Sequence, residues 1–325
     1  MAESFKHKSY KEQADLLESR GIVFSGDKSR SKAEHSLSVI SYYKIKEFAK
    51  PFAKIQKNGQ DKIIDYQNTK FELVISRYYQ DKNLRLNLLH AIEDIEVAIK
   101  TKIAYVLGRG GLGSYGYLNF SKWCNREEYC KHYLLYSEKK FKNQLKKELK
   151  KSTSSEVIEK LKVDKKHYPP IWLVVNMLTF GQIVTLLELM SVNNLNQVSN
   201  AFSCTNSQLI SWLKCINLTR NICAHNSNII DFKFVTVPQL KDEWKGILYE
   251  YKPGVYSNRI ALPFLIILEM MDKINPKYHF NEIIDSFMKL IKDDNTAHYY
   301  GFDSLQTLKA IKSSKKQKRP YYIKN

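Results

Sequence analysis

Apolar residues recur at helical spacing between Leu84 and Leu107. They follow one another at steps of four, three, four, four and three: Leu88, Ile92, Ile95, Ile99, Ile103 and Val106. This spacing places all six on one face of an α-helix, so the segment is predicted to be a helix that packs against a core. A second, shorter helical run precedes it at Phe71–Gln80.

Most other apolar segments share this helical pattern. Helices are predicted over Lys11–Arg20, Ser31–Phe52, Ile171–Phe180, Val184–Met190, Pro263–Lys273 and Phe280–Ile291. Thr205 and Gln208 form a capping-box pattern that opens a further helix over Ser207–Thr219. After Gly21, only Phe232–Val237 alternates as a strand would. The fold class is therefore predicted to be all-α, a helical bundle.

The helix over Ser207–Thr219 runs into a polar heptapeptide, Arg220–Asn226 (RNICAHN). Arginine is a permanent cation whose planar donors suit phosphate oxygens. Histidine has an unperturbed pKa of about 6.5 and exchanges protons near neutral pH. Together, Arg220 and His225 supply what metal-independent RNA cleavage needs: a base for the ribose 2′-OH and a cation for the developing phosphate charge.

Helical geometry restricts how these two residues act. At about 100° per residue, His225 shares a face with Asn221 but points about 140° away from Arg220. Either the helix ends or bends here, or two copies of the motif meet across an interface. Because the sequence has one such motif, a composite site requires a homodimer. The alternative is that Arg220 and His225 only cap a helix C-terminus.

Net charge indicates the kind of partner. The 325 residues contain 52 Lys and Arg against 33 Asp and Glu, a formal charge of +19. Such an excess favours a polyanion, either nucleic acid or an acidic membrane surface. Seven lysines are concentrated on one stretch: Lys139, Lys140, Lys142, Lys146, Lys147, Lys150 and Lys151. They are equally consistent with a solvated face and with a site for RNA backbone.

Other sequence features narrow the classes of protein further. Five cysteines and a polar N-terminus without a signal peptide predict a cytoplasmic protein with free thiols. Cys124, Cys130 and His132 lack zinc-site spacing, so no metal or other cofactor is expected. The apolar stretches Ile171–Met190 and Ala261–Met271 are interrupted or too short to cross a bilayer, so no membrane association is expected. The GxGxxG spacing in Gly108–Gly116 follows a helix rather than a strand and indicates a loop.

These observations divide the chain into four parts. Residues 1–135 form an N-terminal helical region that includes the core helix 84–107, and residues 136–168 form a basic insertion. Residues 169–312 form a C-terminal helical region that carries the Arg-x4-His motif. Residues 313–325 are a basic tail, predicted to be poorly ordered.

Six blocks in this order resemble the abortive-infection AbiD/AbiF-like family of phage-defence proteins, within the HEPN superfamily of helical nucleases. They are YKEQADLLESRGI (Tyr10–Ile22), SYYKIKEFAKPF (Ser41–Phe52), the stretch Phe71–Gly108, GSYGYLNF (Gly113–Phe120), PPIWLVVNMLTFGQIVTLL (Pro169–Leu187) and LTRNICAHN (Leu218–Asn226). The resemblance implies a HEPN-type bundle with additional N-terminal helices and a lysine-rich insertion.

The resemblance also implies an RNA-cleaving toxin of an abortive-infection or toxin–antitoxin system. Its catalytic residues map onto Arg220 and His225, with Asn221 between them. Glu96 and Lys100, otherwise an ordinary surface pair, match an acidic-then-basic element of HEPN domains: Glu96 would orient Arg220 or His225, and Lys100 would contact phosphate. Relatives include type VI CRISPR effectors, which pair two such motifs in one chain. Some family members act beside a small RNA antitoxin or guide-like regulator.

The chain departs from the family pattern after the motif. His225 is followed by Asn226-Ser227-Asn228-Ile229-Ile230, where the family often has a second histidine. His225 must then carry proton transfer alone, or Asn226 positions it. The competing interpretation is a non-catalytic RNA-binding or protein-docking module on the same scaffold.

Overall fold

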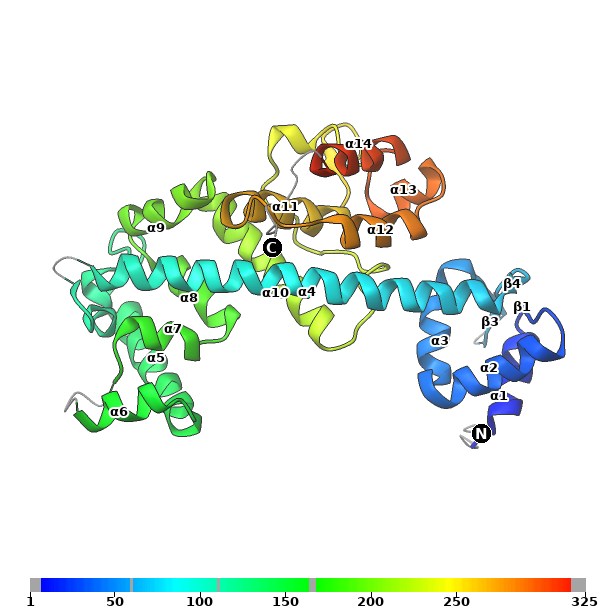
Figure 1. Ribbon diagram of the computed structural model, residues 1–325, viewed down its shortest axis with the longest axis horizontal. Helices are drawn as coiled ribbons and strands as arrows, with labels where there is room; N and C mark the ends of the chain where they lie inside the picture. Colours follow the sequence, from blue (N-terminus) through cyan, green and yellow to red (C-terminus); the bar gives the residue numbers. More distant parts are fainter. Residues whose placement is uncertain (1–6, 59–60, 110–111, 164–167, 317–325) are drawn as a thin grey trace, which may run out of the picture.

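A computed structural model describes residues 7–58, 61–109, 112–163 and 168–316. One long helix, α4 (Phe71–Gly108), runs along the longest axis of the molecule (Figure 1). Its 38 residues correspond to about 57 Å at 1.5 Å per residue. The predicted stripe from Leu88 to Ile103 is fully buried along this helix. The all-α prediction is confirmed.

The N-terminal helices lie at the Phe71 end of α4 (Figure 1). They are α1 (Tyr10–Glu18), α2 (Asp27–Ile40) and α3 (Tyr42–Ala49), followed by the 3-10 turn η1 (Lys50–Phe52). The predicted single helix Ser31–Phe52 is therefore wrong. Ser41 has a φ of 68°, which interrupts the helix between α2 and α3. Its hydroxyl accepts a hydrogen bond from the Lys44 amide at 3.4 Å.

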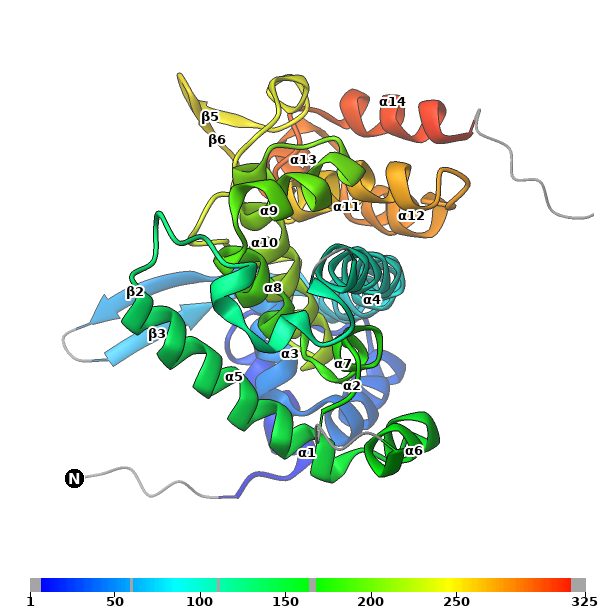
Figure 2. The same ribbon diagram turned by 90° about the vertical axis from the view of Figure 1, so that its left-hand side faces the viewer.

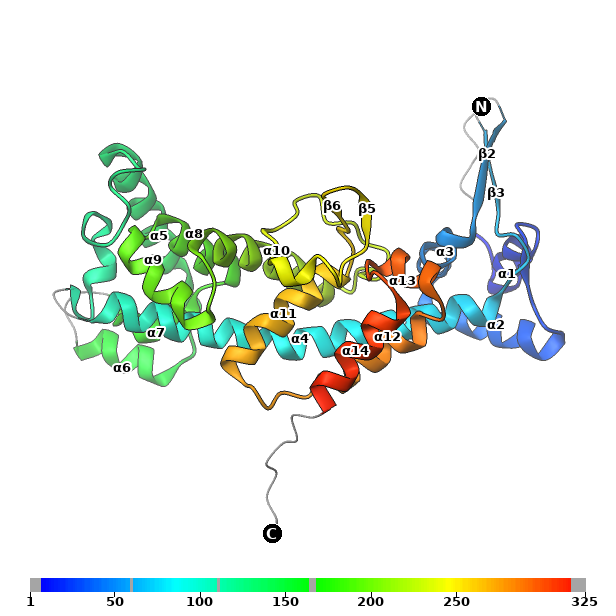
Figure 3. The same ribbon diagram turned by 90° about the horizontal axis from the view of Figure 1, so that it is seen from above.

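Short strands accompany this N-terminal region. Strands β2 (Lys54–Asn58) and β3 (Asp61–Asp65) form an antiparallel hairpin that projects from the body (Figure 3). Strands β1 (Ile22–Val23) and β4 (Thr69–Lys70) form a two-residue parallel pair. The hairpin was not predicted.

The opposite end of α4 carries the lysine-rich helices. Gly108 ends α4, in agreement with the predicted loop, although Gly110 lies outside the described residues. The 3-10 turns η3 (Gly116–Leu118) and η4 (Phe120–Lys122) lead to α5 (Lys131–Lys151) and α6 (Ser155–Val163). Figure 2 looks along α4 from this end and shows α5 as an outlying helix.

The C-terminal half covers α4 on several sides. It comprises α7 (Ile171–Met177), α8 (Phe180–Leu189), α9 (Val192–Ser199), η5 (Asn200–Phe202), α10 (Asn206–Ala224), η6 (Asp242–Trp244), β5 (Glu250–Lys252), β6 (Val255–Tyr256), α11 (Ala261–Ile274), α12 (Asn281–Leu290), α13 (Asp294–Tyr300) and α14 (Leu305–Lys316). Helices α3, α7, α9, α10, α11 and α12 all contact α4. A continuous core therefore surrounds this one helix.

Three further predictions of helix and strand boundaries need correction. The predicted helix Ile171–Phe180 ends at Met177, because Thr179 caps α8 with a capping box through Gln182. Phe232–Val237 is not a strand. Ser313 to Lys316 belong to α14 rather than to an unstructured tail, and residues 317–325 lie outside the described part.

No helix among the described residues is long and apolar enough to cross a bilayer.

Candidate functional site

The heptapeptide motif lies at the C-terminal end of α10. The capping box opens this helix as predicted: the Gln208 amide donates to the Thr205 hydroxyl at 3.1 Å. The helix ends at Ala224, and His225 is its C-cap. The backbone from Arg220 to Ala224 is helical up to the residue before His225, so the end of the helix does not by itself bring Arg220 and His225 onto one face.

The helix stops through a defined turn. The Asn226 amide donates to the Cys223 carbonyl at 3.3 Å, and the Ser227 amide donates to the Ile222 carbonyl at 3.0 Å. These are the two hydrogen bonds of a Schellman motif, which needs a left-handed residue after the cap. Asn226 supplies it with a φ of 56°. Asn226 thus ends the helix, and the imidazole of His225 is left exposed to solvent.

Arg220 faces a charged pair on α4. Glu96 binds Lys100 at 2.7 Å through one carboxylate oxygen, and its other oxygen lies 4.0 Å from Nε of Arg220. A separation of 4.0 Å is an ion pair but too long for a hydrogen bond. The Arg220 side chain is 43% exposed, against 17% for Glu96. Its guanidinium is therefore held beside the Glu96 carboxylate, while its N–H donors stay available to a second anion.

Asn221 and His225 share a helix face, and neither side chain has a hydrogen bond to any residue in the described part of the chain. The Asn221 carbonyl accepts the His225 amide at 3.0 Å, so the two are joined through the backbone. Asn221 is half-buried. Both side chains remain available for a ligand.

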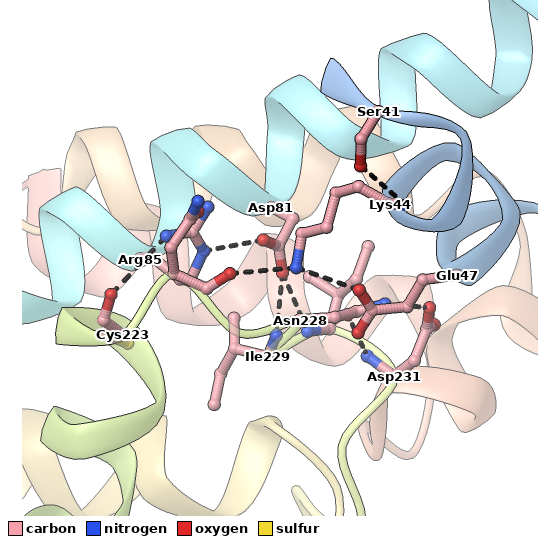
Figure 4. A network of polar contacts seen from close by, with 11 residues as sticks. Ser41, Lys44, Glu47, Asp81, Arg85, Cys223, Asn228, Ile229 and Asp231 are labelled. Atoms are coloured by element: carbon pink, nitrogen blue, oxygen red, sulfur yellow. Dashed lines mark hydrogen bonds and ion pairs between the residues drawn. The ribbon is translucent and has the colours of Figure 1, made fainter. Parts of the chain in front are cut away.

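The segment after His225 is anchored by a buried ion pair on α4 that we did not predict from the sequence. Asp81 accepts from Nε of Arg85 at 2.7 Å, and its other oxygen accepts the backbone amides of Ile229 and Ile230 at 2.8 and 3.2 Å (Figure 4). Arg85 also donates to the Cys223 carbonyl at 3.5 Å. Burial raises the pKa of Asp81, while Arg85 and the two amides oppose that rise.

A second anchor lies at Asp231. Its carboxylate receives Arg77 at 2.5 Å, the Tyr299 hydroxyl at 2.8 Å and the Asn228 side-chain amide at 2.7 Å. Lys44 of α3 donates to the Asn226 carbonyl at 2.9 Å (Figure 4). The segment that departs from the family pattern is thus fixed on both sides of Ile229.

The sequence contained a signal for this anchor. Arg77, Asp81 and Arg85 recur every four residues and extend the apolar stripe of α4 backwards. Charged side chains at core-facing positions indicate a buried ion pair, because an isolated buried charge is strongly disfavoured.

The lysines predicted to contact RNA lie apart from the motif. They belong to α5, beside the Gly108 end of α4, whereas α10 crosses α4 along its middle (Figure 1). Lys142 binds Glu138 at 2.6 Å, and the other six side chains are exposed. Within the described ranges, no group of three or more His, Cys, Asp or Glu side chains is placed to hold a metal ion.

The sequence profile of the Abi-like protein family matches residues 35–231, more than half of the chain. This chain belongs to the Abi-like protein family. No curated protein and no solved structure gives a significant match. The matched region of the Abi-like protein contains α4, α5 and the whole motif, and it ends at the anchored residue Asp231. The family associates the chain with abortive infection, a form of phage defence.

Proposed function

We propose that this Abi-like protein is a metal-independent endoribonuclease toxin that acts in the cytoplasm during phage infection. The observation that carries the proposal is the end of α10. There an exposed histidine follows a helix terminus, and an arginine with free donors lies beside a carboxylate on α4. A base and a cation of this kind are what cleavage through the ribose 2′-OH requires.

In this proposal His225 removes the proton from the 2′-OH. The 2′-oxygen then forms a bond to the adjacent phosphorus, the bond from phosphorus to the 5′-oxygen breaks, and a proton passes to that oxygen. Arg220 neutralises the phosphate oxygens as their charge grows. Glu96 holds Arg220 in place, Lys100 contacts phosphate, and Asn221 binds substrate beside His225. The products are a 2′,3′-cyclic phosphate and a 5′-hydroxyl.

The chain offers one histidine in the motif for two proton transfers. We therefore propose a homodimer in which the motif ends of two α10 helices face one another. The second transfer then falls to the other copy. The lysines of α5 hold RNA backbone, and a small RNA regulator that restrains the toxin is the partner that would suit them.

The test incubates purified protein with labelled single-stranded RNA in excess EDTA and determines the product ends by mass spectrometry. Cleavage that resists EDTA and leaves a 2′,3′-cyclic phosphate is expected. Arg220→Ala and His225→Ala should each abolish it. Both side chains reach solvent, so the melting temperature should change little. His35→Ala, which removes an exposed histidine on α2, is the matched control and should retain full activity.

Two outcomes would contradict the proposal. If both variants unfold, the motif stabilises the fold instead of acting on RNA. If RNA stays intact yet shifts in a native gel, the alternative of a non-catalytic RNA-binding module is favoured.

The dimer has its own test. Wild-type protein mixed with an excess of the inactive variant His225→Ala should lose more activity than dilution alone explains, because each mixed dimer keeps only one His225 for the two proton transfers. A wild-type protein that is monomeric by sedimentation and fully active would refute the composite site.

A further inference from the structure

A cavity of about 660 Å³ lies between α5 and the segment of 3-10 turns that precedes it. Its lining combines aromatic and aliphatic side chains with cations: Phe120, Tyr129, Leu134, Arg126 and Lys131. Small-molecule sites in proteins typically have volumes of about 300–1,000 Å³ and such mixed walls. The cavity is separate from the Arg220–His225 motif, with which it shares no lining residue.

One wall of the cavity offers a fixed aromatic surface. The Tyr129 hydroxyl donates to the Glu188 carbonyl at 3.3 Å, and its ring stacks on Tyr133 with centroids 5.3 Å apart. Burial raises the pKa of Tyr129 to about 12, so the phenol is neutral at physiological pH. Phe120 and Leu134 are almost fully buried and close the base of the cavity.

The charges at the cavity favour an anion. Glu138 is the one carboxylate in its lining, and both oxygens are occupied: one accepts the Phe120 amide at 2.9 Å and the other accepts Lys142 at 2.6 Å. Arg126 and Lys131 are exposed, and among the described residues neither has an ion-pair partner. The Tyr129 ring beside these two cations fits a nucleotide, whose base stacks and whose phosphate is anionic.

One lysine that lines the cavity, Lys142, belongs to a row of lysines along α5. Lys139, Lys142, Lys146 and Lys150 follow at steps of three and four, so at about 100° per residue they lie within about 80° of one another. Lys140, Lys147 and Lys151 lie on a different face of the same helix. A polyanion bound along the first row would reach the cavity at its end.

We propose that this cavity binds one unpaired nucleotide of an RNA strand whose backbone follows the first lysine row. The proposal rests on the proposed action on RNA and adds a second contact remote from the motif. A free nucleotide carries the same base and phosphate groups. The experiments below distinguish a nucleotide within an RNA strand from a free nucleotide.

The test measures fluorescence anisotropy of a labelled oligouridine on the His225→Ala background, which removes cleavage. Ser121 is exposed and lines the cavity, so Ser121→Trp fills it without disturbing the core. We expect the Kd to rise roughly tenfold, the size of one lost base-stacking contact. Ser207→Trp, at an exposed position at the start of α10, is the matched control and should leave the Kd unchanged.

A pair of charge variants tests the lysine row. Lys146→Ala with Lys150→Ala should weaken binding and reduce the slope of log Kd against log salt by about 1.4. Lys140→Ala with Lys147→Ala removes the same charge from another face and should change the slope much less.

An unchanged Kd in Ser121→Trp would overturn the proposal, and so would equal effects of the two lysine pairs. Calorimetry with UMP measures whether the cavity binds a free nucleotide. If UMP binds, Ser121→Trp abolishes that binding and RNA affinity is unaffected, the ligand is a free nucleotide and the RNA proposal is wrong. Since anisotropy does not depend on cleavage, a protein that leaves RNA intact but shows the Ser121→Trp effect refutes the nuclease alone.

Discussion

Removal of the Asp81 carboxylate is predicted to destabilise the protein strongly. Asp81 has no exposed side-chain surface and accepts three hydrogen bonds, from Arg85 and from the backbone amides of Ile229 and Ile230. Asp81→Ala leaves the Arg85 guanidinium, whose side chain is 5% exposed, without a counter-charge. Breaking a buried pair in this way costs about 3–5 kcal/mol. A typical domain has about 5–15 kcal/mol in total, so the variant loses a large fraction of its stability.

Urea unfolding followed by circular dichroism measures this loss. Asp242→Ala is the control: it breaks the ion pair with Lys245, three residues along the chain, but Asp242 is 90% exposed and its loss should cause no measurable change. Asp81→Leu combined with Arg85→Met should recover part of the stability, because both buried charges are then removed together while the Ile229 and Ile230 amides lose their acceptor. A loss below about 1 kcal/mol in Asp81→Ala would show that the pair does not anchor the segment after His225.

Three other predictions concern backbone geometry and thiols. Asn226→Val should lose about 1–2 kcal/mol in urea unfolding, because a β-branched residue resists the left-handed φ, whereas Asn226→Gly should be tolerated. Gly301→Ala should lose about 2 kcal/mol or more in the same assay, since its φ is 99° and a Cβ would lie 2.5 Å from the Ser257 hydroxyl; an unchanged midpoint would contradict this. Iodoacetamide at pH 8, followed by mass spectrometry, should modify the exposed Cys130 and spare Cys223, since burial raises the pKa of Cys223 to about 12. That pKa lies above the ordinary value of 9.0, so between pH 9 and 12 the thiol ionises in the unfolded chain but not in the folded one. The contribution of the buried thiol to the free energy of unfolding is therefore present below pH 9 and is lost as the pH rises towards 12.

Local sequence patterns were sufficient for much of the helical framework. The stripe from Leu88 to Val106 predicted the core face of α4, and the Thr205–Gln208 pair predicted where α10 begins. Both signals are contained within a few turns of one helix.

Features that depend on distant residues could not be predicted in the same way. The sequence predicted two helical segments, Phe71–Gln80 and Leu84–Leu107, where the structure has the single helix α4. Asp81 lies between them, and its carboxylate is buried against the Ile229 and Ile230 amides, 148 and 149 residues away. The alternation in Phe232–Val237 suggested a strand, but Phe234 bonds to the Asn258 carbonyl and Val235 is 94% exposed, so no neighbouring strand completes a sheet.

The candidate site shows the same division. The sequence predicted a helix over Ser207–Thr219 that leads into the motif. Its end at Ala224 was not predicted, and the closeness of Glu96 to Arg220 required α4 and α10 to be packed together. The resemblance to the family indicated Glu96 as a site residue but did not predict where it lies relative to Arg220. The roles of these residues in catalysis stay predictions.

Because α4 is one uninterrupted helix, it fixes the spacing between its two contacts with the motif end of α10. Arg85 donates a hydrogen bond to the Cys223 carbonyl, and Glu96 forms an ion pair with Arg220. Two positions on α4 therefore hold the last turn of α10. These points are eleven residues apart, three turns to within about 20°, and about 16 Å along the axis. One residue inserted between them would turn Glu96 by about 100° and shift it by about 1.5 Å. The distance between the two contacts is therefore set by the residue count of α4, and length changes between Arg85 and Glu96 should be far less tolerated than substitutions on its exposed face.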